Sequence, residues 1–483
     1  MGEQTLKEKT AKGLLWGGMS NGMIQVLSAL LGIVLLRLLT PDDYGKIAVL
    51  VIFSSIASNL QESGFVAALC NKKEPLHEDY NAVFWFNIIV SIGIYIILFF
   101  CAPLIADFYH EPVLVPLSRY LFLSFVISSF GTVQRAYLFG HLMVKQSSLS
   151  MVTALVVSNL IGILMAWNGF AFWGIATQTL IYIAVIVAFN WYYSPWRPTF
   201  HIDLRPAWRM FGFSSKLLVT YIFNQLTSNV FGVLLGKFYN TELAGLYNNA
   251  RKWDDMCINT INGMVTGVAQ PVLAQVRDEN ERYCNVFRKM LRFVCFVSFP
   301  AMFGMGLVAR EFILITVGPA WEASAALLSL LSIYGAFYPI MTLYSNLTIS
   351  RGKSGINMFC TIALCVLIWT GLIALQSFGL YTMVYFFISI NILWLFVWHY
   401  FAWRLTGLSL FAVMKDVVPF LVLALGVMAL TWWITSPIEN IYVLFVAKVI
   451  VAAVLYVGLT YLSGAKIMRE SIAYIKKKKV EKL

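Results

Sequence analysis

Long apolar segments constrain this chain more than any other feature of its sequence. Fourteen runs of mostly apolar residues follow one another, separated by short polar connections. A helix of about 20 such residues, rising about 1.5 Å per residue, matches the hydrocarbon core of a bilayer, which is about 30 Å thick. Because only helices and closed barrels satisfy their backbone hydrogen bonds inside that core, the runs predict an all-α integral membrane protein.

The fourteen runs define the predicted membrane spans. In chain order they are Leu14–Leu39, Lys46–Leu69, Phe84–Phe108, Val113–Gly140, Ser147–Trp167, Phe170–Tyr193, Phe211–Phe238, Leu243–Gln275, Tyr283–Val308, Ala320–Ser350, Ser354–Ser377, Leu380–Leu405, Leu408–Thr435 and Ile441–Ser463. An even number of spans places both termini on the same side of the membrane.

The composition excludes most other classes of protein. Of the 483 residues, 60% are hydrophobic and 12% are charged, whereas soluble domains carry about 25% charged residues. The seven cysteines are scattered without metal-ligand spacing, and the chain contains no phosphate-binding loop, metalloprotease motif or nucleophile elbow. We therefore expect a protein that is not an enzyme and that binds no metal and no cofactor.

The formal net charge of +12 is explained mainly by membrane topology. Of the 35 Lys and Arg residues, 27 fall on one side of the predicted spans and eight on the other. Since cytoplasmic loops are enriched in Lys and Arg, both termini are expected in the cytoplasm. The basic tail Lys476–Lys479 is expected to contact anionic membrane lipid rather than nucleic acid.

A weak internal repeat indicates two related halves. Shifting the chain by 200 residues aligns residues 21–50 with residues 221–250 and gives five identities. These pair Gln25 with Gln225, Ser28 with Ser228, Gly32 with Gly232, Leu35 with Leu235 and Gly45 with Gly245, while Arg37 falls on Lys237 and Asp42 on Glu242. Because the shift spans six predicted helices, both halves share one orientation in the membrane.

The repeat predicts a domain organisation. We expect an N-terminal six-helix lobe over residues 1–210 and a C-terminal six-helix lobe over residues 211–406, related by a pseudo-twofold axis. Two appended helices over residues 407–464 and a basic cytoplasmic tail over residues 465–483 follow. A cavity between the lobes is the expected substrate site.

Several short motifs resemble those of polysaccharide exporters. The string Arg37–Gly45, R-L-L-T-P-D-D-Y-G, resembles the signature that follows the first helix of these proteins. Further matches follow in the same order: Glu62–Phe65, Ala67–Leu69, Phe84–Asn87, Ala102–Phe108, Val133–Ala136, Gly236–Phe238, Leu243–Tyr247 and Phe299–Pro300. The whole is similar to Wzx-type flippases of the multidrug/oligosaccharidyl-lipid/polysaccharide exporter superfamily, in particular to the colanic-acid and teichuronic-acid branch.

The resemblance carries its own expectations. It implies a fourteen-helix, two-lobe fold in the bacterial cytoplasmic (inner) membrane. It also implies movement of undecaprenyl-diphosphate-linked oligosaccharide to the outer leaflet for surface polysaccharide such as lipopolysaccharide O-antigen. A polysaccharide polymerase and glycosyltransferases of the same pathway are the implied protein partners.

A diphosphate carried through a membrane needs cations, and a cation at membrane depth costs roughly 2.5–3.5 kcal/mol unless it pairs, snorkels or lines a cavity. The candidate diphosphate-binding cations are Arg251, Lys252, Arg37, Lys237, Arg119, Arg135 and Lys216. Arg37 and Lys237 either line the cavity rim or snorkel, and Arg135 and Lys216 also fit the positive-inside bias. Lys448 is expected to snorkel outward.

Two further sets of residues are candidates. Asp254, Asp255 and Glu62 are candidates for ion coupling or gating, and Arg251 can face both aspartates at helical spacing. That cluster is either a substrate anchor or an interfacial group of salt bridges, and Glu62 is either a gate or an exposed acid. The polar residues Gln25, Ser28, Asn224, Gln225 and Ser228 either line a wet cavity or make interhelical hydrogen bonds, each worth about 0.6 kcal/mol.

Three alternatives to a flippase stay open. A cation-coupled multidrug or small-solute antiporter of the same superfold would favour buried carboxylates over buried cations. A membrane glycosyltransferase or ligase that uses the same lipid carrier would carry catalytic residues on a long external loop, and the external connections here are short. A non-transporting lipid-binding protein of the glycan pathway fits the same composition.

Overall fold

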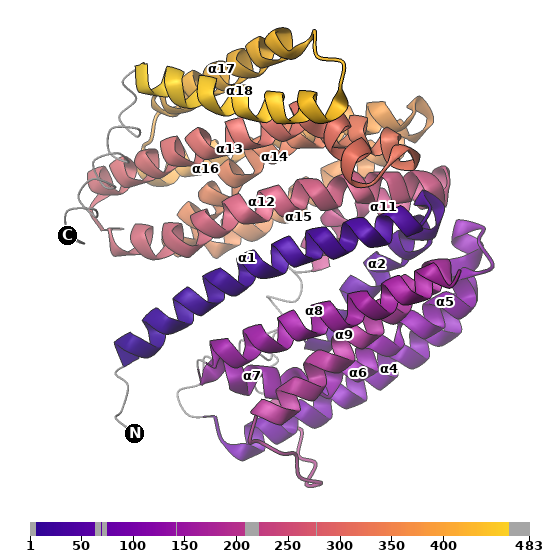
Figure 1. The fold of residues 1–483 in the computed structure, drawn as a ribbon. Helices are drawn as coiled ribbons and strands as arrows, with labels where there is room; N and C mark the ends of the chain where they lie inside the picture. Colours follow the sequence, from indigo (N-terminus) through magenta and orange to yellow (C-terminus); the bar gives the residue numbers. More distant parts are fainter. Residues whose placement is uncertain are drawn as a thin grey trace. The chain divides into compact units, whose positions relative to one another are not determined.

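The computed structural model describes residues 6–62, 69, 75–141, 143–207, 222–276 and 278–462. Within these ranges all regular secondary structure is helical, which confirms the predicted all-α fold. The chain divides into two compact units, Met1–Gly245 and Leu246–Leu483, whose helices are labelled in Figure 1.

Most of the predicted spans are present as membrane-length helices. Among the described residues, nine helices are long and apolar enough to cross a membrane, and a bent pair makes a tenth if it counts as one span. The chain is therefore a multi-pass membrane protein. The total of fourteen stays a prediction, because the runs Leu14–Leu39, Lys46–Leu69, Phe211–Phe238 and Leu243–Gln275 have no counterpart among these ten.

The first unit is built around three neighbouring long helices. Its helices are α1 (Leu6–Leu38), α2 (Pro41–Glu62), α4 (His77–Tyr109), α5 (Leu114–Leu121), α6 (Leu123–Ser129), α7 (Thr132–Gly140), α8 (Val144–Trp167), α9 (Ala171–Tyr193) and α11 (Val230–Phe238). Helix α8 packs against α1 and α9 (Figure 1). A Cβ on Gly174 would lie 3.1 Å from the carbonyl oxygen of Gly162, so small residues allow α8 and α9 to approach closely.

The predicted span over Val113–Gly140 is not one straight helix. The structure breaks it into α5, α6 and α7, with a 44° bend between Leu114–Ser129 and Thr132–Gly140. Ser129 and Thr132 each donate a side-chain hydrogen bond to a carbonyl oxygen of the preceding turn, a pattern that bends helices. Gly131 lies at the bend, where a Cβ would come within 2.7 Å of the Val187 side chain.

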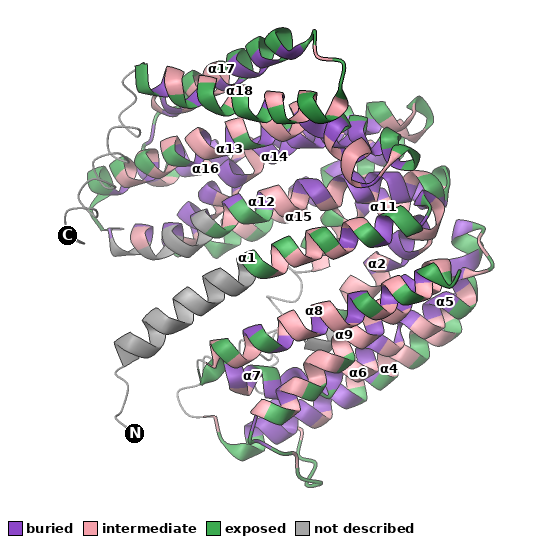
Figure 2. Ribbon diagram, viewed as in Figure 1, coloured by how far each residue is buried: buried purple, intermediate pink, exposed green. Residues whose placement is uncertain are grey.

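The second unit is arranged around a central helix pair. Its helices are α12 (Thr241–Gln275, whose first residues belong to the first unit), α13 (Asn280–Thr316), α14 (Glu322–Ser350), α15 (Ser354–Leu375), α16 (Leu380–Thr406), α17 (Leu410–Thr435) and α18 (Ile441–Leu462), with short 3-10 turns at Pro319–Trp321 and Gln376–Phe378. Helices α13 and α14 pack together, α16 covers α14, and the α17–α18 hairpin packs on α13. Of the apolar span of α14, 61% is buried, against 11% for α18, whose outer face is exposed in Figure 2.

A proline in α13 shows how a neighbouring helix compensates for a lost hydrogen bond. Pro300 has no N–H group, so the carbonyl oxygen of Phe296, four residues earlier, loses its donor within the helix. The Tyr456 hydroxyl of α18 donates to that oxygen at 2.9 Å. A free carbonyl in the membrane is thereby satisfied, and α18 is tied to the middle of α13.

Candidate functional site

The cluster predicted on α12 forms as the helical spacing requires. Arg251 Nη1 lies 3.2 Å from Asp254 Oδ2, and Nη2 lies 2.9 Å from Asp255 Oδ1. The Arg251 side chain is 16% exposed and that of Asp254 is fully buried. One guanidinium group is therefore shared between two carboxylates.

The surroundings of this cluster come from α12 and α14. The centre of the Tyr334 ring lies 5.1 Å from Arg251 Cζ, a cation–π distance. Asp254 Oδ1 is buried and makes no hydrogen bond. A Cβ at position 335 would lie 2.8 Å from this oxygen, so Gly335 leaves it room.

The charges of Arg251, Asp254 and Asp255 do not sum to zero without a neighbouring cation. Arg251 and the two ionised aspartates carry one net negative charge, and Lys252 brings the group to neutrality. Lys252 is half-buried, with Nζ 5.7 Å from the centre of the Trp253 ring. The two carboxylates contact Nη1 and Nη2 of Arg251, and protonation of a carboxylate would weaken its hold on the guanidinium group.

The two copies of the sequence repeat begin a helix in the same way. Asp43 N donates to Thr40 Oγ1 at 3.2 Å, and Thr40 N donates to Asp43 Oδ2 at 3.1 Å, so Thr40 caps α2 reciprocally. At the equivalent position in the other copy, Asn240 Oδ1 accepts from Leu243 N at 2.8 Å and caps α12. The exporter-like signature therefore contains a helix start.

The glycines of the repeat make a reciprocal contact. A Cβ on Gly45 would lie 1.7 Å from the carbonyl oxygen of Thr241, and a Cβ on Gly245 would lie 1.9 Å from that of Pro41. Positions 41 and 241, like 45 and 245, are equivalent in the repeat. The contact thus has the self-complementarity that a two-fold axis produces. The Thr241 hydroxyl also donates to the Asp42 carboxylate.

The repeat-related cations Arg37 and Lys237 have different environments. Arg37 is exposed in the last turn of α1. Lys237 is half-buried in the last turn of α11, with Nζ 4.6 Å from the centre of the Phe108 ring of α4. Equivalent positions in the sequence therefore differ in how far their side chains are buried.

Arg119 supports the α4 backbone. Its Nε donates to the carbonyl oxygen of Phe99 at 3.3 Å, and its Cζ lies 4.1 Å from the centre of the Phe99 ring. Pro103, four residues later, cannot donate to that oxygen. Arg119 therefore replaces a missing backbone donor.

The other candidates do not gather into one described site. Gln25 and Ser28 are half-buried on α1, and Arg135 is exposed on α7. Asn224, Gln225 and Ser228 lie in the helical residues 222–228, where Gln225 Oε1 accepts from Asn229 Nδ2 at 3.2 Å. Lys216 and the side chain of Glu62 lie outside the described part of the chain.

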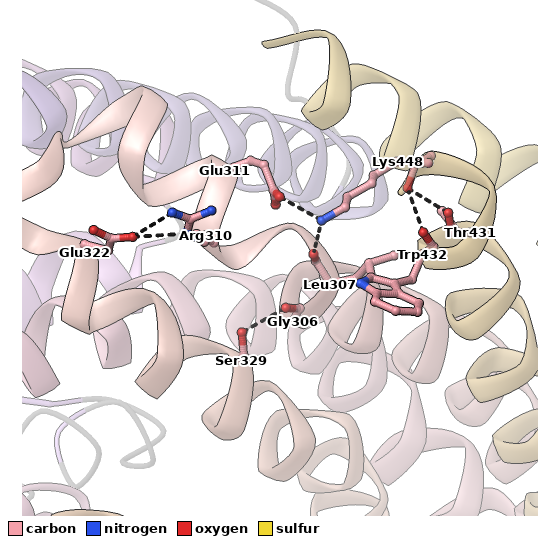
Figure 3. Close-up of polar contacts among 10 residues, drawn as sticks. Gly306, Leu307, Arg310, Glu311, Glu322, Ser329, Thr431, Trp432 and Lys448 are labelled. Carbon is pink, nitrogen blue, oxygen red and sulfur yellow. Dashed lines mark hydrogen bonds and ion pairs between the residues drawn. The ribbon is translucent and has the colours of Figure 1, made fainter. Parts of the chain in front are cut away.

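The expectation that Lys448 snorkels outward is wrong. Its Nζ lies 2.7 Å from Glu311 Oε1 and donates to the carbonyl oxygen of Leu307 at 3.2 Å, as Figure 3 shows. The two charged side chains are 9% and 7% exposed, between α18 and α13. A charge at membrane depth needs a partner, but the sequence does not show which helices lie next to one another and so does not identify the partner.

A second ionic cluster between helices was missed in the same way. Arg288 Nε lies 2.6 Å from Asp416 Oδ2, and Arg292 Nη1 lies 2.9 Å from Asp416 Oδ1. The Asp416 side chain is 5% exposed, and the arginines are 28% and 30% exposed. The start of α17 is thereby joined to the start of α13.

Comparison with known proteins identifies the family. The family model described as polysaccharide biosynthesis protein matches residues 34–326. The chain belongs to this family. Among curated proteins of similar sequence, the teichuronic acid biosynthesis protein TuaB of Bacillus subtilis (strain 168) is 24% identical over 448 residues, which cover 88% of this chain and 89% of TuaB.

Another relative and a solved structure extend the similarity. The lipopolysaccharide biosynthesis protein WzxC of Escherichia coli (strain K12) is 25% identical over 359 residues, 73% of this chain and 72% of WzxC. The lipid II flippase MurJ, in an inward closed conformation, shares the fold with a TM-score of 0.76 at 12% identity, over 95% of this chain and 100% of MurJ. The resemblance of this chain to Wzx-type exporters, which its motifs indicated, is confirmed.

Proposed function

We propose that this protein is a flippase of surface polysaccharide biosynthesis. It moves undecaprenyl-diphosphate-linked oligosaccharide units from the cytoplasmic to the outer leaflet of the bacterial cytoplasmic membrane. Membership of the polysaccharide biosynthesis family over residues 34–326 is the observation that carries this proposal. The membrane-length helices support it, as does the fold that this chain shares with a lipid II flippase.

Arg251 and Lys252 are proposed to bind the diphosphate. The planar guanidinium group binds carboxylates and phosphates through the same pair of parallel hydrogen bonds. In the structure the two carboxylates Asp254 and Asp255 contact that group. A phosphate that replaces one of them finds a cation already fixed in position by its helix.

Asp254 and Asp255 are proposed to couple substrate binding to a proton. A protonated carboxyl group holds Arg251 less strongly, so the guanidinium N–H groups become available to the diphosphate. When the substrate leaves, the carboxylate loses its proton and pairs with Arg251 again. The unpartnered, buried Oδ1 of Asp254 supports this role, because a proton there would leave no existing hydrogen bond broken.

The remaining assignments complete the proposal. The lobes expected over residues 1–210 and 211–406 would open the substrate site alternately to each side of the membrane, with both chain termini in the cytoplasm. We propose that the outlying cations guide the diphosphate, that the polar residues contact sugars, and that Glu62 gates the cytoplasmic side. The cations are Arg37, Lys237, Arg119, Arg135 and Lys216, and the polar residues are Gln25, Ser28, Asn224, Gln225 and Ser228.

Deletion and complementation test the function and the site separately. A strain without this protein should accumulate lipid-linked oligosaccharide in the cytoplasmic leaflet, and the wild-type chain should relieve the accumulation. The variant Arg251→Ala/Lys252→Ala should not relieve it, at an unchanged amount of protein in the membrane. Arg282→Ala, which removes an exposed arginine paired with Glu279, is the matched control and should behave as wild type.

The two possible failures are distinguishable. A deletion strain that accumulates no lipid-linked precursor would contradict the flippase function. Normal export by Arg251→Ala/Lys252→Ala would contradict only the assignment of the diphosphate site.

A further inference from the structure

The cluster at the start of α13 and α17 has more positive than negative charge. Arg288 and Arg292, one helical turn apart, both contact Asp416, and their atoms reach both of its carboxylate oxygens. One buried carboxylate therefore faces two guanidinium groups, which leaves one positive charge uncompensated. Lys415, next to Asp416, is exposed and adds another positive charge nearby.

Donors in this cluster remain available. Arg288 uses Nε and Nη2 toward Asp416, and Arg292 uses only Nη1. Arg292 Nε is buried without a hydrogen-bond partner, and such a donor is costly to leave unmatched. Since both arginine side chains also reach the surface, an anion that accepts several hydrogen bonds could complete the cluster.

The uncharged stretches that follow the cluster on α13 and α17 indicate its depth in the membrane. Residues 293–309, between Arg292 and Arg310, include no charged residue. They extend over about 26 Å as a helix, close to the thickness of the hydrocarbon core. On α17 the uncharged stretch, residues 417–435, begins immediately after Asp416. The cluster thus lies at one edge of the hydrocarbon core, next to the level of lipid phosphates.

We propose that Arg288 and Arg292, which both contact Asp416, bind the phosphate group of a lipid through their remaining N–H groups. Phosphate accepts the bidentate hydrogen bonds that guanidinium groups offer, and it neutralises the excess charge. Phe293, Phe411 and Met414, neighbours of the cluster in sequence, are 44%, 80% and 40% exposed and suit the apolar chains of such a lipid. The inference does not rest on the proposed flippase function.

Lipid retention by the purified full-length protein tests this site. The protein in detergent is mixed with phosphatidylglycerol or with diacylglycerol, which lacks the phosphate, and bound lipid is counted by native mass spectrometry. Wild type should retain phosphatidylglycerol in preference to diacylglycerol. Arg288→Gln/Arg292→Gln should lower that retention roughly tenfold, the effect of losing hydrogen bonds to a charged group. Arg282→Gln on the same helix should change nothing.

Asp416→Asn separates a phosphate site from a purely structural contact. A phosphate site predicts that this variant retains as much phosphatidylglycerol as wild type or more, because a competing anion is removed. A structural contact alone predicts that Asp416→Asn and Arg288→Gln/Arg292→Gln lose lipid equally, and that result would overturn the proposal. If Asp416→Asn does not fold, Arg292→Lys takes its place: it keeps the charge but loses the fork, so reduced retention supports the site and unchanged retention contradicts it.

The source of the phosphate is resolved by competition. Stronger binding of phosphatidylglycerol than of undecaprenyl phosphate identifies a bulk membrane lipid, and the reverse order identifies the carrier lipid. Displacement of both by inorganic phosphate alone shows that the headgroup suffices. Each of these results supports phosphate recognition, whereas equal retention of diacylglycerol and both phospholipids contradicts it.

Discussion

Two ionic clusters in the second unit have opposite stoichiometry. On α12, one guanidinium group contacts two carboxylates, and at the start of α13 and α17, one carboxylate contacts two guanidinium groups. The first cluster can take up a proton on a carboxylate, and the second can take up an anion. The pair of Lys448 and Glu311, with one charge of each sign, needs neither. The balance of charges, rather than the mere presence of buried charge, therefore indicates what each cluster can bind.

The largest effect is expected from breaking the α12 cluster. Arg251→Gln leaves Asp254 and Asp255 close together without their cation, which should abolish export and lower the free energy of unfolding by about 3–5 kcal/mol. Export is measured as relief of precursor accumulation, and stability as thermal unfolding in detergent. Arg251→Gln/Asp254→Asn/Asp255→Asn should recover much of the stability but no export. Recovery of export in this neutral variant would show that the charges are only structural.

Breaking the ion pair of Glu311 and Lys448 should lower the stability of the protein and should not affect export by itself. Glu311→Gln leaves the Lys448 ammonium buried without a counter-charge and should cost about 3 kcal/mol of unfolding free energy. Glu311→Gln/Lys448→Met should restore most of it, because an apolar side chain suits the interface of α13 and α18. Thermal unfolding measures both variants. Loss of export in the stable double variant would contradict the view that this pair binds nothing.

The stability of the protein should depend less on Asp416, the acid of the cluster with excess positive charge, than on Glu311. Asp416→Asn should cost about 1–2 kcal/mol, because Arg288 and Arg292 both reach the surface and can be solvated there. The unfolding temperature should therefore fall less than in Glu311→Gln. An equal or larger fall would mean that the two guanidinium groups depend on Asp416 as a buried pair does.

The smallest effect is expected at the ion pair of Asp42 and Lys46, at the boundary of the predicted span Lys46–Leu69. Burial raises the pKa of the Asp42 carboxyl, but hydrogen bonds from Lys46 and Thr241 and the charge of Lys46 outweigh it, so the pKa lies below its usual value. A carboxyl group with a lowered pKa stabilises the folded protein above its unfolded pKa, and the stabilisation disappears as the pH falls through the folded pKa.

The pH dependence of unfolding measures this contribution. The difference in unfolding temperature between wild type and Asp42→Asn should be slight near neutral pH and should vanish as the pH falls through the lowered pKa of the folded protein. Since 43% of the Asp42 side chain is exposed, solvent weakens the interaction. A difference that grows with acidity would contradict the sign of the pKa shift.

The sequence predicts features that depend on neighbours along one helix. The lengths of the apolar runs predict the membrane helices, and the spacing of Arg251, Asp254 and Asp255 predicts their cluster on α12. The pairs that the sequence did not predict join helices: Glu311 and Lys448 are 137 residues apart. Helical periodicity contains no information about which helices become neighbours, so such pairs need the fold.

The bend in the predicted span Val113–Gly140 shows a different limit of prediction from the sequence. Hydropathy alone registers the apolar character of this stretch, and it does not register the hydrogen bonds of Ser129 and Thr132 to the backbone. The close approach of Gly131 to Val187 adds a constraint from another helix. Local polar residues could have suggested the break, whereas its 44° angle depends on packing.

The reciprocal contact of Gly45 and Gly245 has a consequence for which substitutions the two copies of the repeat can accept. Most aligned positions differ between the copies, since residues 21–50 and 221–250 share five identities. At this contact a larger residue fits neither copy, because any side chain added to one meets the backbone of the other. The residue type at each glycine is therefore constrained by a segment 200 residues away in the chain rather than by its own helix.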